Sequence, residues 1–203
     1  MIIKVFIQAR MSSQRFPGKV LAPFRGQPVI QHVIDAVCKT FPAQDVVVAT
    51  STHPSDDPLA AYLEARGVNV FRGPLDNVLG RFCEALKVHP CDWMIRICAD
   101  SPLMEPSVVS LVTAHANGHA DLVTNVCPRT FPTGHSVEMI RSSTLTALNS
   151  TRLDDYEREH VTAHLYRHPE RYSIVNVASP AGDRSAISLA IDTVEDLQRL
   201  ERL

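Results

Sequence analysis

The chain has 203 residues, of which 45% are hydrophobic and 21% are charged, and its formal net charge is −2 at pH 7. This composition is that of a globular chain and excludes long disordered segments. The small negative charge excludes the broadly basic surface with which proteins hold nucleic acid, so we expect no nucleic-acid partner.

A membrane location is excluded on similar grounds. No stretch approaches the roughly 20 consecutive apolar residues that cross a bilayer, and the short apolar run at the N-terminus lacks a small-residue cleavage site. We therefore expect a cytoplasmic protein with no membrane partner. Its length suits a single domain over residues 1–203.

In the first half of the chain, short β-branched runs alternate with amphipathic stretches of helix length. The expected strands are Ile2–Ile7, Asp45–Thr50, Val68–Phe71 and Asp92–Ala99, and the expected helices are Val29–Cys38, Pro58–Arg66 and Asp76–Val88. Gly67 can supply the left-handed cap that ends the second helix. Because the strand runs are largely apolar on both faces, they suit a parallel sheet covered by helices. This order predicts a doubly wound α/β sheet over about residues 1–125.

The pattern is looser in the second half, about residues 126–203. Its apolar runs are Ser136–Ile140, Tyr172–Ala178 and Ala186–Asp192, and its expected helices are Ser143–Asn149, Asp155–Arg167 and Val194–Leu203. Thr193 and Asp196 have the spacing of a capping box for the last helix. We expect this half to be mixed, with antiparallel additions to the sheet.

The cysteines and histidines offer no clear metal motif. The five cysteines form no CxxC pair and no disulfide framework, so we interpret them as reduced thiols at apolar positions: Cys38, Cys83, Cys91, Cys98 and Cys127. Two sets of histidines recur every four residues, His160, His164 and His168 in one and His115 and His119 in the other. A zinc site is conceivable on either helical face. No cysteine or carboxylate completes either set at ligand spacing, so we interpret both as solvated helical faces.

A basic stretch, QARMSSQRFPGK, follows the first expected strand at residues 8–19. Its three cations repel one another unless an anion lies among them; they are Arg10, Arg15 and Lys19. The two serines and Gly18 leave backbone N–H groups accessible, arginines can fork onto phosphate oxygens, and a lysine can act as a point charge. The stretch matches neither common glycine-rich phosphate motif, and a solvated basic loop is the alternative interpretation.

Two aspartates are expected at strand ends. Asp100 ends the fourth expected strand in RICADSP, and Asp192 ends the last apolar run in LAIDTVEDL. Ligands of open α/β sheets bind outside the carboxyl ends of the strands, so both carboxylates would face the basic stretch. Two carboxylates can hold a Mg²⁺ ion that bridges phosphates. Each aspartate could instead be only a turn or helix cap, but with the basic stretch they predict a site for a nucleoside triphosphate and Mg²⁺.

Five segments resemble the spore-coat-polysaccharide type of cytidylyltransferase and, more distantly, sugar-acid cytidylyltransferases such as 3-deoxy-manno-octulosonate cytidylyltransferase. They read QARMSSQRFPGKVLAPFRGQPVIQHVI, FRGPLDNVLGRF, RICADSPLMEPSVV, REHVT and LAIDTVEDL, within a resemblance from Ile2 to about Leu200. The resemblance implies a GT-A-like (nucleotide-diphospho-sugar transferase) fold, a Rossmann-type mixed sheet flanked by helices. It also implies transfer of CMP from CTP to a sugar-like or sugar-acid acceptor, with release of pyrophosphate, in polysaccharide or surface glycan biosynthesis.

The same resemblance implies roles for particular residues. The nucleotide would be bound by Gln8, Ala9, Arg10, Met11, Ser12, Ser13, Arg15, Lys19 and Ala99. Catalysis would rest on Arg10, Lys19 and Asp100, and the expected cofactor, Mg²⁺, would be held by Asp100 and Asp192. The resemblance implies acceptor binding for Glu138, Glu159 and His160, with a dimer contact as the alternative for the last two. Arg72, Asp76 and Arg81 follow the third expected strand and could contact the base or the acceptor. A plain surface salt-bridge set is the alternative for Arg72, Asp76 and Arg81.

The second half is expected to bind the acceptor and to form a homodimer. Arg129 and Thr133, in the turn-rich CPRTFPTG, are further candidates for contacting an anionic acceptor. Two positions depart from the spore-coat type: Ser136 stands where an acidic residue is usual, and Cys98 stands where a hydroxyl is usual.

Two other functions fit the same implied fold. A glycosyltransferase-like protein that binds a sugar nucleotide is one, but such proteins usually carry Asp-x-Asp at the metal, and this chain has no such motif. A catalytically weak binding subunit is the other, and its only support is Ser136 in place of the acid.

Overall fold

A mixed sheet of seven strands forms the centre of the protein in the computed structural model, which describes residues 1–116 and 118–203. In order across the sheet the strands are β5 (Asn69–Gly73), β4 (Val46–Ser51), β1 (Ile3–Gln8), β6 (Trp93–Cys98), β8 (Glu138–Arg141), β7 (Leu122–Thr124) and β9 (Ile174–Asn176). All run parallel except β8, which pairs antiparallel with both β6 and β7. The expected α/β class and the antiparallel addition from the second half are confirmed.

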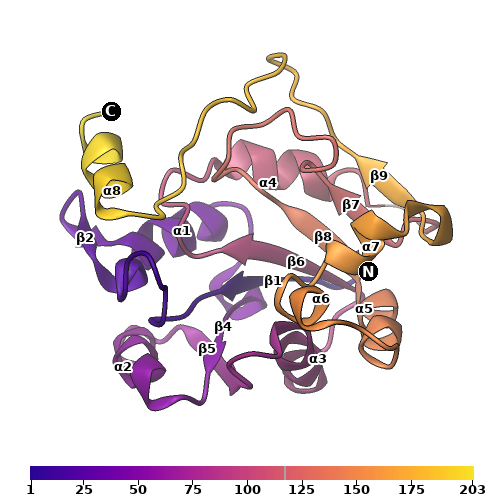
Figure 1. Cartoon of the computed structure of the whole chain (residues 1–203), viewed down its shortest axis with the longest axis horizontal. Helices are drawn as coiled ribbons and strands as arrows, with labels where there is room; N and C mark the ends of the chain where they lie inside the picture. Colours follow the sequence, from indigo (N-terminus) through magenta and orange to yellow (C-terminus); the bar gives the residue numbers. More distant parts are fainter. Residues whose placement is uncertain (117) are drawn as a thin grey trace.

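Helices cover both faces of this sheet because its strands are apolar on both sides. Along β1, Val5 and Ile7 belong to one buried cluster and Phe6 to the other. The first cluster packs against α1 (Val29–Cys38), α2 (Asp57–Glu64) and α4 (Pro106–Thr113). The second packs against α3 (Val78–Val88), α5 (Ser142–Asn149) and α7 (Ala163–Arg167). Figure 1 shows α1 and α4 on one side of the sheet and α3 and α5 on the other.

The C-terminal helix lies apart from these layers. Helix α8 (Val194–Glu201) packs through Leu200 against Phe24 and Ile191, next to the short hairpin of β2 (Pro23–Phe24) and β3 (Gln27–Pro28). Its start is stabilised as the sequence predicts, because Thr193 and Asp196 form a complete capping box.

The prediction of one long polar helix over Asp155–Arg167 is wrong. This segment forms two short helices, α6 (Asp155–Glu159) and α7. At the break, Val161 turns fully into the apolar core and Thr162 donates a hydrogen bond of 2.7 Å to buried Glu138. The apolar core and Glu138 therefore determine where the chain turns between the two helices. The helical pattern in the sequence does not reveal these contacts.

The strand expected over Ala186–Asp192 is also absent. This run lies in an irregular connection, residues 178–193, in which Ser188 forms an isolated β-bridge with Thr133. Thr133 receives a hydrogen bond from Leu189 N at 2.7 Å, and Ile191 N donates to Asp100 O at 2.8 Å. These contacts bring the end of the connection back to the end of β6.

The positions of two cysteines and of one histidine pair differ from those expected. None of the five cysteines forms a disulfide, but Cys38 and Cys127 are exposed, so the expectation of apolar surroundings is wrong for these two. They lie at the end of α1 and in a turn, where the chain meets solvent. His115 and His119 do not share a helix, because α4 ends at Thr113.

Of the helices within residues 1–116 and 118–203, none is long and apolar enough to span a bilayer.

Candidate active site

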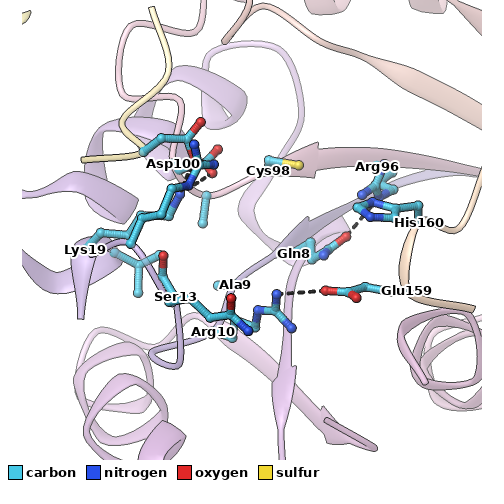
Figure 2. A pocket seen from close by; sticks show the side chains of 15 residues that line it. Gln8, Ala9, Arg10, Ser13, Lys19, Arg96, Cys98, Asp100, Glu159 and His160 are labelled. Atoms are coloured by element: carbon cyan, nitrogen blue, oxygen red, sulfur yellow. Dashed lines mark hydrogen bonds and ion pairs between the residues drawn. The ribbon is translucent and has the colours of Figure 1, made fainter. Parts of the chain in front are cut away.

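A pocket opens beside β1, on whose two sides successive strands are added in turn. From β1 the chain adds β4 on one side and later β6 on the other, so the carboxyl ends of β1 and β6 form the switch point at which such sheets bind ligands. A pocket of about 540 Å³ lies there (Figure 2). Its lining consists of Gln8, Ala9, Arg10, Ser13, Gln14, Arg15, Lys19, Val20, Arg96, Cys98, Ala99, Asp100, Glu159, His160 and Asp192.

The basic loop after β1 is closed by its own backbone. Gly18 has φ of +76°, a conformation that favours glycine, and its N–H donates to Met11 O at 2.8 Å. Met11 N in turn donates to a carboxylate oxygen of Asp56 at 2.7 Å. Asp56 is fully buried and was not singled out from the sequence, where it reads only as an aspartate before a helix. The closed loop places Lys19 at the start of a single helical turn, facing the pocket.

Lys19 lies between Asp100, which follows β6, and Asp192, which lies near the end of the irregular connection. Its Nζ is 2.7 Å from Asp100 Oδ2, 3.1 Å from Asp192 Oδ1 and 2.8 Å from the backbone oxygen of Ile191. Burial alone would lower the pKa of Lys19, but the charges and hydrogen bonds of Asp100 and Asp192 outweigh it and raise the pKa above its ordinary value. Lys19 is therefore a charged, well-held cation.

The two arginines of the basic loop reach different walls of the pocket. Arg15 is 2.9 Å from Asp192 Oδ1 and its side chain is 66% exposed. Arg10 donates to Glu159 Oε1 at 2.8 Å and so joins the loop to the end of α6. Both guanidinium groups are solvent-accessible enough to exchange these partners for an anionic ligand.

Arg96, in the middle of β6, also lines the pocket. Its Nε donates to Gln8 Oε1 at 2.9 Å, and its Nη1 forms an ion pair with Glu138. Glu138 also accepts hydrogen bonds from Thr162 Oγ1 at 2.7 Å and Tyr166 OH at 2.8 Å. Burial would raise the pKa of Glu138, but Arg96 and the two hydroxyls outweigh it and lower the pKa. Sequence reasoning did not single out Arg96, although an arginine within the apolar run WMIRIC was the available signal.

The remaining sequence candidates divide by position. Glu159 and His160 line the pocket, whereas four other acceptor candidates do not: Arg72, Asp76, Arg81 and Glu138. Arg72 pairs at 2.6 Å with Asp57, a residue outside the salt-bridge set that the sequence suggested as the alternative. Arg81 is only 1% exposed, and burial lowers the pKa of its guanidinium to about 10. Met11 and Ser12 belong to the loop but do not line the pocket.

The two departures from the spore-coat pattern have different positions. Ser136 accepts a hydrogen bond of 3.0 Å from Arg129 Nη2, and neither residue lines the pocket, nor does Thr133. Cys98 does line it, and burial raises the pKa of its thiol to about 11. Cys98 is therefore a neutral thiol near pH 7, unsuited to act as a nucleophile.

The oxygens around the Lys19 ammonium suit a divalent cation. Asp100 and Asp192 offer carboxylates, and Ile191 offers a carbonyl, all converging on one point. Mg²⁺ favours such hard oxygen donors and usually takes one or two carboxylates while keeping several waters. The donor set therefore fits the expected Mg²⁺.

Comparison with known proteins defines first the class and then the family. The CTP complex of CMP:2-keto-3-deoxy-manno-octonic acid synthetase has a TM-score of 0.72 at 18% identity, covering 100% of this chain and 98% of that one, which shows the nucleotidyltransferase fold. A cytidylyltransferase of Leptospira borgpetersenii serovar Hardjo-bovis (strain JB197) has a TM-score of 0.94 at 30% identity, covering 99% and 85%.

The sequence comparisons agree with the structural ones. Over 210 residues the chain is 31% identical to the spore coat polysaccharide biosynthesis protein SpsF of Bacillus subtilis (strain 168), covering 99% of this chain and 85% of that protein. A family model described as cytidylyltransferase matches residues 4–203. The protein belongs to the cytidylyltransferase family, and the resemblance recognised in the sequence is confirmed.

Proposed function

We propose that the protein transfers CMP from CTP to a sugar-like or sugar-acid acceptor. A hydroxyl oxygen of the acceptor attacks the α-phosphorus of CTP and loses its proton to solvent. The bond from this phosphorus to the oxygen shared with the β-phosphorus breaks, and pyrophosphate leaves. The observation that carries the proposal is the meeting of Arg10, Arg15 and Lys19 with Asp100 and Asp192 in one pocket at the switch point of the sheet. Phosphoryl transfer rests on positioning and charge neutralisation, which these residue types supply without a covalent enzyme intermediate.

The phosphates would lie at the end of the pocket that holds Lys19. Arg15 and Lys19 both contact Asp192 Oδ1, so two cations share one carboxylate oxygen. A bound triphosphate would take over both cations through its oxygens and leave the carboxylates to a metal ion. Lys19, fixed by the closed loop, would then stabilise the negative charge that develops on the phosphates during transfer.

We propose Mg²⁺ as the cofactor, held by Asp100 and Asp192. When bound, it would neutralise charge on the triphosphate and on the leaving pyrophosphate. Two features support this proposal: Asp100 directly follows β6, and the hydrogen bond from Ile191 N to Asp100 O joins the segment of Asp192 to that of Asp100 beside the pocket.

The acceptor would lie at the opposite end of the pocket. Figure 2 shows Gln8, Arg96 and His160 together, away from Lys19 and Asp100, with Glu159 beside them. An amide, a guanidinium, an imidazole and a carboxylate offer both donors and acceptors, which suits a hydroxyl-rich molecule. The name of the spore coat relative supports a role in polysaccharide biosynthesis, and the CTP-bound structural neighbour supports CTP as the donor.

Measurement of pyrophosphate release tests this function. Each of the four nucleoside triphosphates is supplied with Mg²⁺, with and without a panel of sugar acids and phosphosugars. We expect release that needs CTP, Mg²⁺ and one acceptor together. Binding of sugar nucleotides without pyrophosphate release would favour the glycosyltransferase-like alternative. Nucleotide binding without turnover for any acceptor would favour a weak binding subunit.

The homodimer and the cytoplasmic location stay predictions. We propose that residues 126–203 supply the dimer contacts. Analytical ultracentrifugation is expected to give twice the chain mass of 22.5 kDa, and a mass of 22.5 kDa would contradict the dimer.

A further inference from the structure

A second cluster of possible metal ligands lies where α6 meets α7. Ligand atoms of Glu157, His164 and His168 all lie within 4.8 Å of one another. Glu157 Oε1 is 3.0 Å from His164 Nδ1, and the ring centroids of His164 and His168 are 4.5 Å apart. Glu157 and His164 are buried and His168 is half-buried. None of the three lines the pocket of the candidate active site.

This arrangement corrects the interpretation of the histidine series as a solvated face without a carboxylate. The break between α6 and α7 carries Glu157 beside His164 and turns His160 towards the active-site pocket instead. His164 is only 8% exposed, so it belongs to the packed interface between these two helices. The carboxylate that the histidine spacing lacked comes from the preceding helix.

We propose that Glu157, His164 and His168 bind a divalent transition metal, with Zn²⁺ the ion that their chemistry suits best. Zn²⁺ favours imidazole nitrogens and carboxylate oxygens in a tetrahedral arrangement, in which ligand atoms lie about 3.3 Å apart. The Glu157–His164 distance is already near this value. The half-buried His168 must close the remaining gap of at most about 1.5 Å by a side-chain rotation. The fourth position falls to water or to Glu170, whose Oε1 is 3.7 Å from His168 Nδ1.

Two arginines lie beside the proposed site, and one of them, the 64% exposed Arg171, is 3.5 Å from Glu170 Oε1. Arg167 Nη1 is 3.3 Å from Glu157 Oε1 and 2.9 Å from Asp154 Oδ2. The Arg167 side chain is 46% exposed, so it can keep Asp154 and leave Glu157 when a metal binds. The other oxygen of Glu157 accepts from Asp154 N at 3.1 Å in a capping box, which leaves Oε1 as the ligand oxygen.

A metal here would join α6 to α7. Helix α6 ends at Glu159, whose carboxylate bonds to Arg10 across the pocket. The site would therefore hold the wall on which the acceptor is proposed to lie. Metal binding itself does not depend on the proposed function, because its ligands lie outside the active-site pocket.

Zinc binding by the full chain tests the proposal. Protein treated with a chelator is dialysed against Zn²⁺ in excess Mg²⁺, which occupies oxygen-only sites, and bound zinc is measured by mass spectrometry. We expect one zinc per chain for the wild type, for Asp192→Asn, which removes a carboxylate of the other site, and for His115→Ala, a histidine outside the cluster.

Two variants should weaken zinc binding at least tenfold. His168→Ala changes a half-buried ligand, so the fold is expected to survive, and circular dichroism checks it. Glu157→Gln keeps an oxygen for the capping box but removes the carboxylate. Wild-type zinc occupancy that persists in both variants, or no zinc in the wild type, would overturn the proposal.

Thermal unfolding and cobalt spectra distinguish this site from the cysteines. With free Zn²⁺ at 100 times its Kd, the Tm of the wild type should rise by about 5–10 °C, and that of His168→Ala should not. Cobalt substitution should give a spectrum of nitrogen and oxygen ligands. A thiolate charge-transfer band would assign the metal to cysteines and contradict the proposal.

Discussion

Lys19 joins segments of the candidate site that are far apart in the sequence. Three like charges in one loop are unfavourable alone, but Lys19 meets two carboxylates and a backbone oxygen that arrive from distant parts of the chain. A buried ammonium needs such partners, because an unpaired buried charge is costly. The same contacts hold Lys19 where a triphosphate would come within its reach.

Replacing Lys19 should therefore reduce transfer more than it reduces folding. For Lys19→Ala we expect a loss of about 3 kcal/mol of transition-state stabilisation, which lowers kcat by a hundredfold or more. Pyrophosphate release with saturating CTP, Mg²⁺ and the acceptor found in the four-nucleotide assay measures kcat. Lys39→Ala, at an exposed lysine after α1, is the matched control and should leave turnover unchanged. Near-wild-type turnover in Lys19→Ala would refute this role.

Glu138 should make stability depend on pH. Its pKa lies below the ordinary value of 4.5 in the folded protein, so its contribution is complete above that value and is lost as the pH falls through the lower folded pKa. Glu138→Gln removes one partner of a buried ion pair, which typically costs about 3–5 kcal/mol at pH 7. Urea unfolding from pH 7 downward should show the difference from wild type narrowing in acid.

A control and a contrary result are available for this prediction. Glu64→Gln, on the exposed surface of α2, should change the free energy of unfolding by less than about 0.5 kcal/mol. A difference between Glu138→Gln and wild type that stays constant well below pH 4 would contradict the assigned role of the Glu138 charge.

At the scale of elements, one irregular connection completes the candidate site. Residues 178–193 carry Asp192 back to the pocket, and they pack tightly against Gly134. Gly134 has φ of +100°, and a Cβ there would lie 2.7 Å from the carbonyl carbon of Leu189. Rotating a side chain would relieve neither the positive φ nor the close approach, because the neighbouring atoms belong to the backbone.

Gly134→Ala should thus displace the connection and Asp192 with it. Gly182→Ala is the matched control, since Gly182 also has positive φ, +81°, but open space around it. Both changes carry a conformational cost of about 1–2 kcal/mol, and the clash should add about 1–3 kcal/mol at Gly134 only. Chemical denaturation measures both, and a fall in Mg²⁺ affinity should accompany Gly134→Ala alone. Equal effects of the two changes would contradict this account.

Across the whole molecule, prediction from sequence worked where the local pattern of apolar and polar residues determines the secondary structure. The apolar runs of β1, β4 and β6 and the amphipathic face of α1 revealed the α/β sheet. The expectation that Asp100 faces the basic stretch is met by the distance of 2.7 Å from Lys19 Nζ to Asp100 Oδ2. Prediction from sequence failed where contacts with residues distant in the chain determine the backbone path. The turn at Val161 and Thr162 depends on Glu138, and the path to Asp192 depends on Thr133 and Gly134. For the same reason, the sequence carries least information about the end of the pocket at which we propose that the acceptor binds.

The central claim is that one pocket holds the triphosphate and its metal, and a crystal structure with CTP and Mg²⁺ tests it most directly. We expect the triphosphate between the basic loop and the end of β6, with Lys19 on a phosphate oxygen and Mg²⁺ on Asp100 and Asp192. A triphosphate bound elsewhere, or a metal that touches neither carboxylate, would contradict the account.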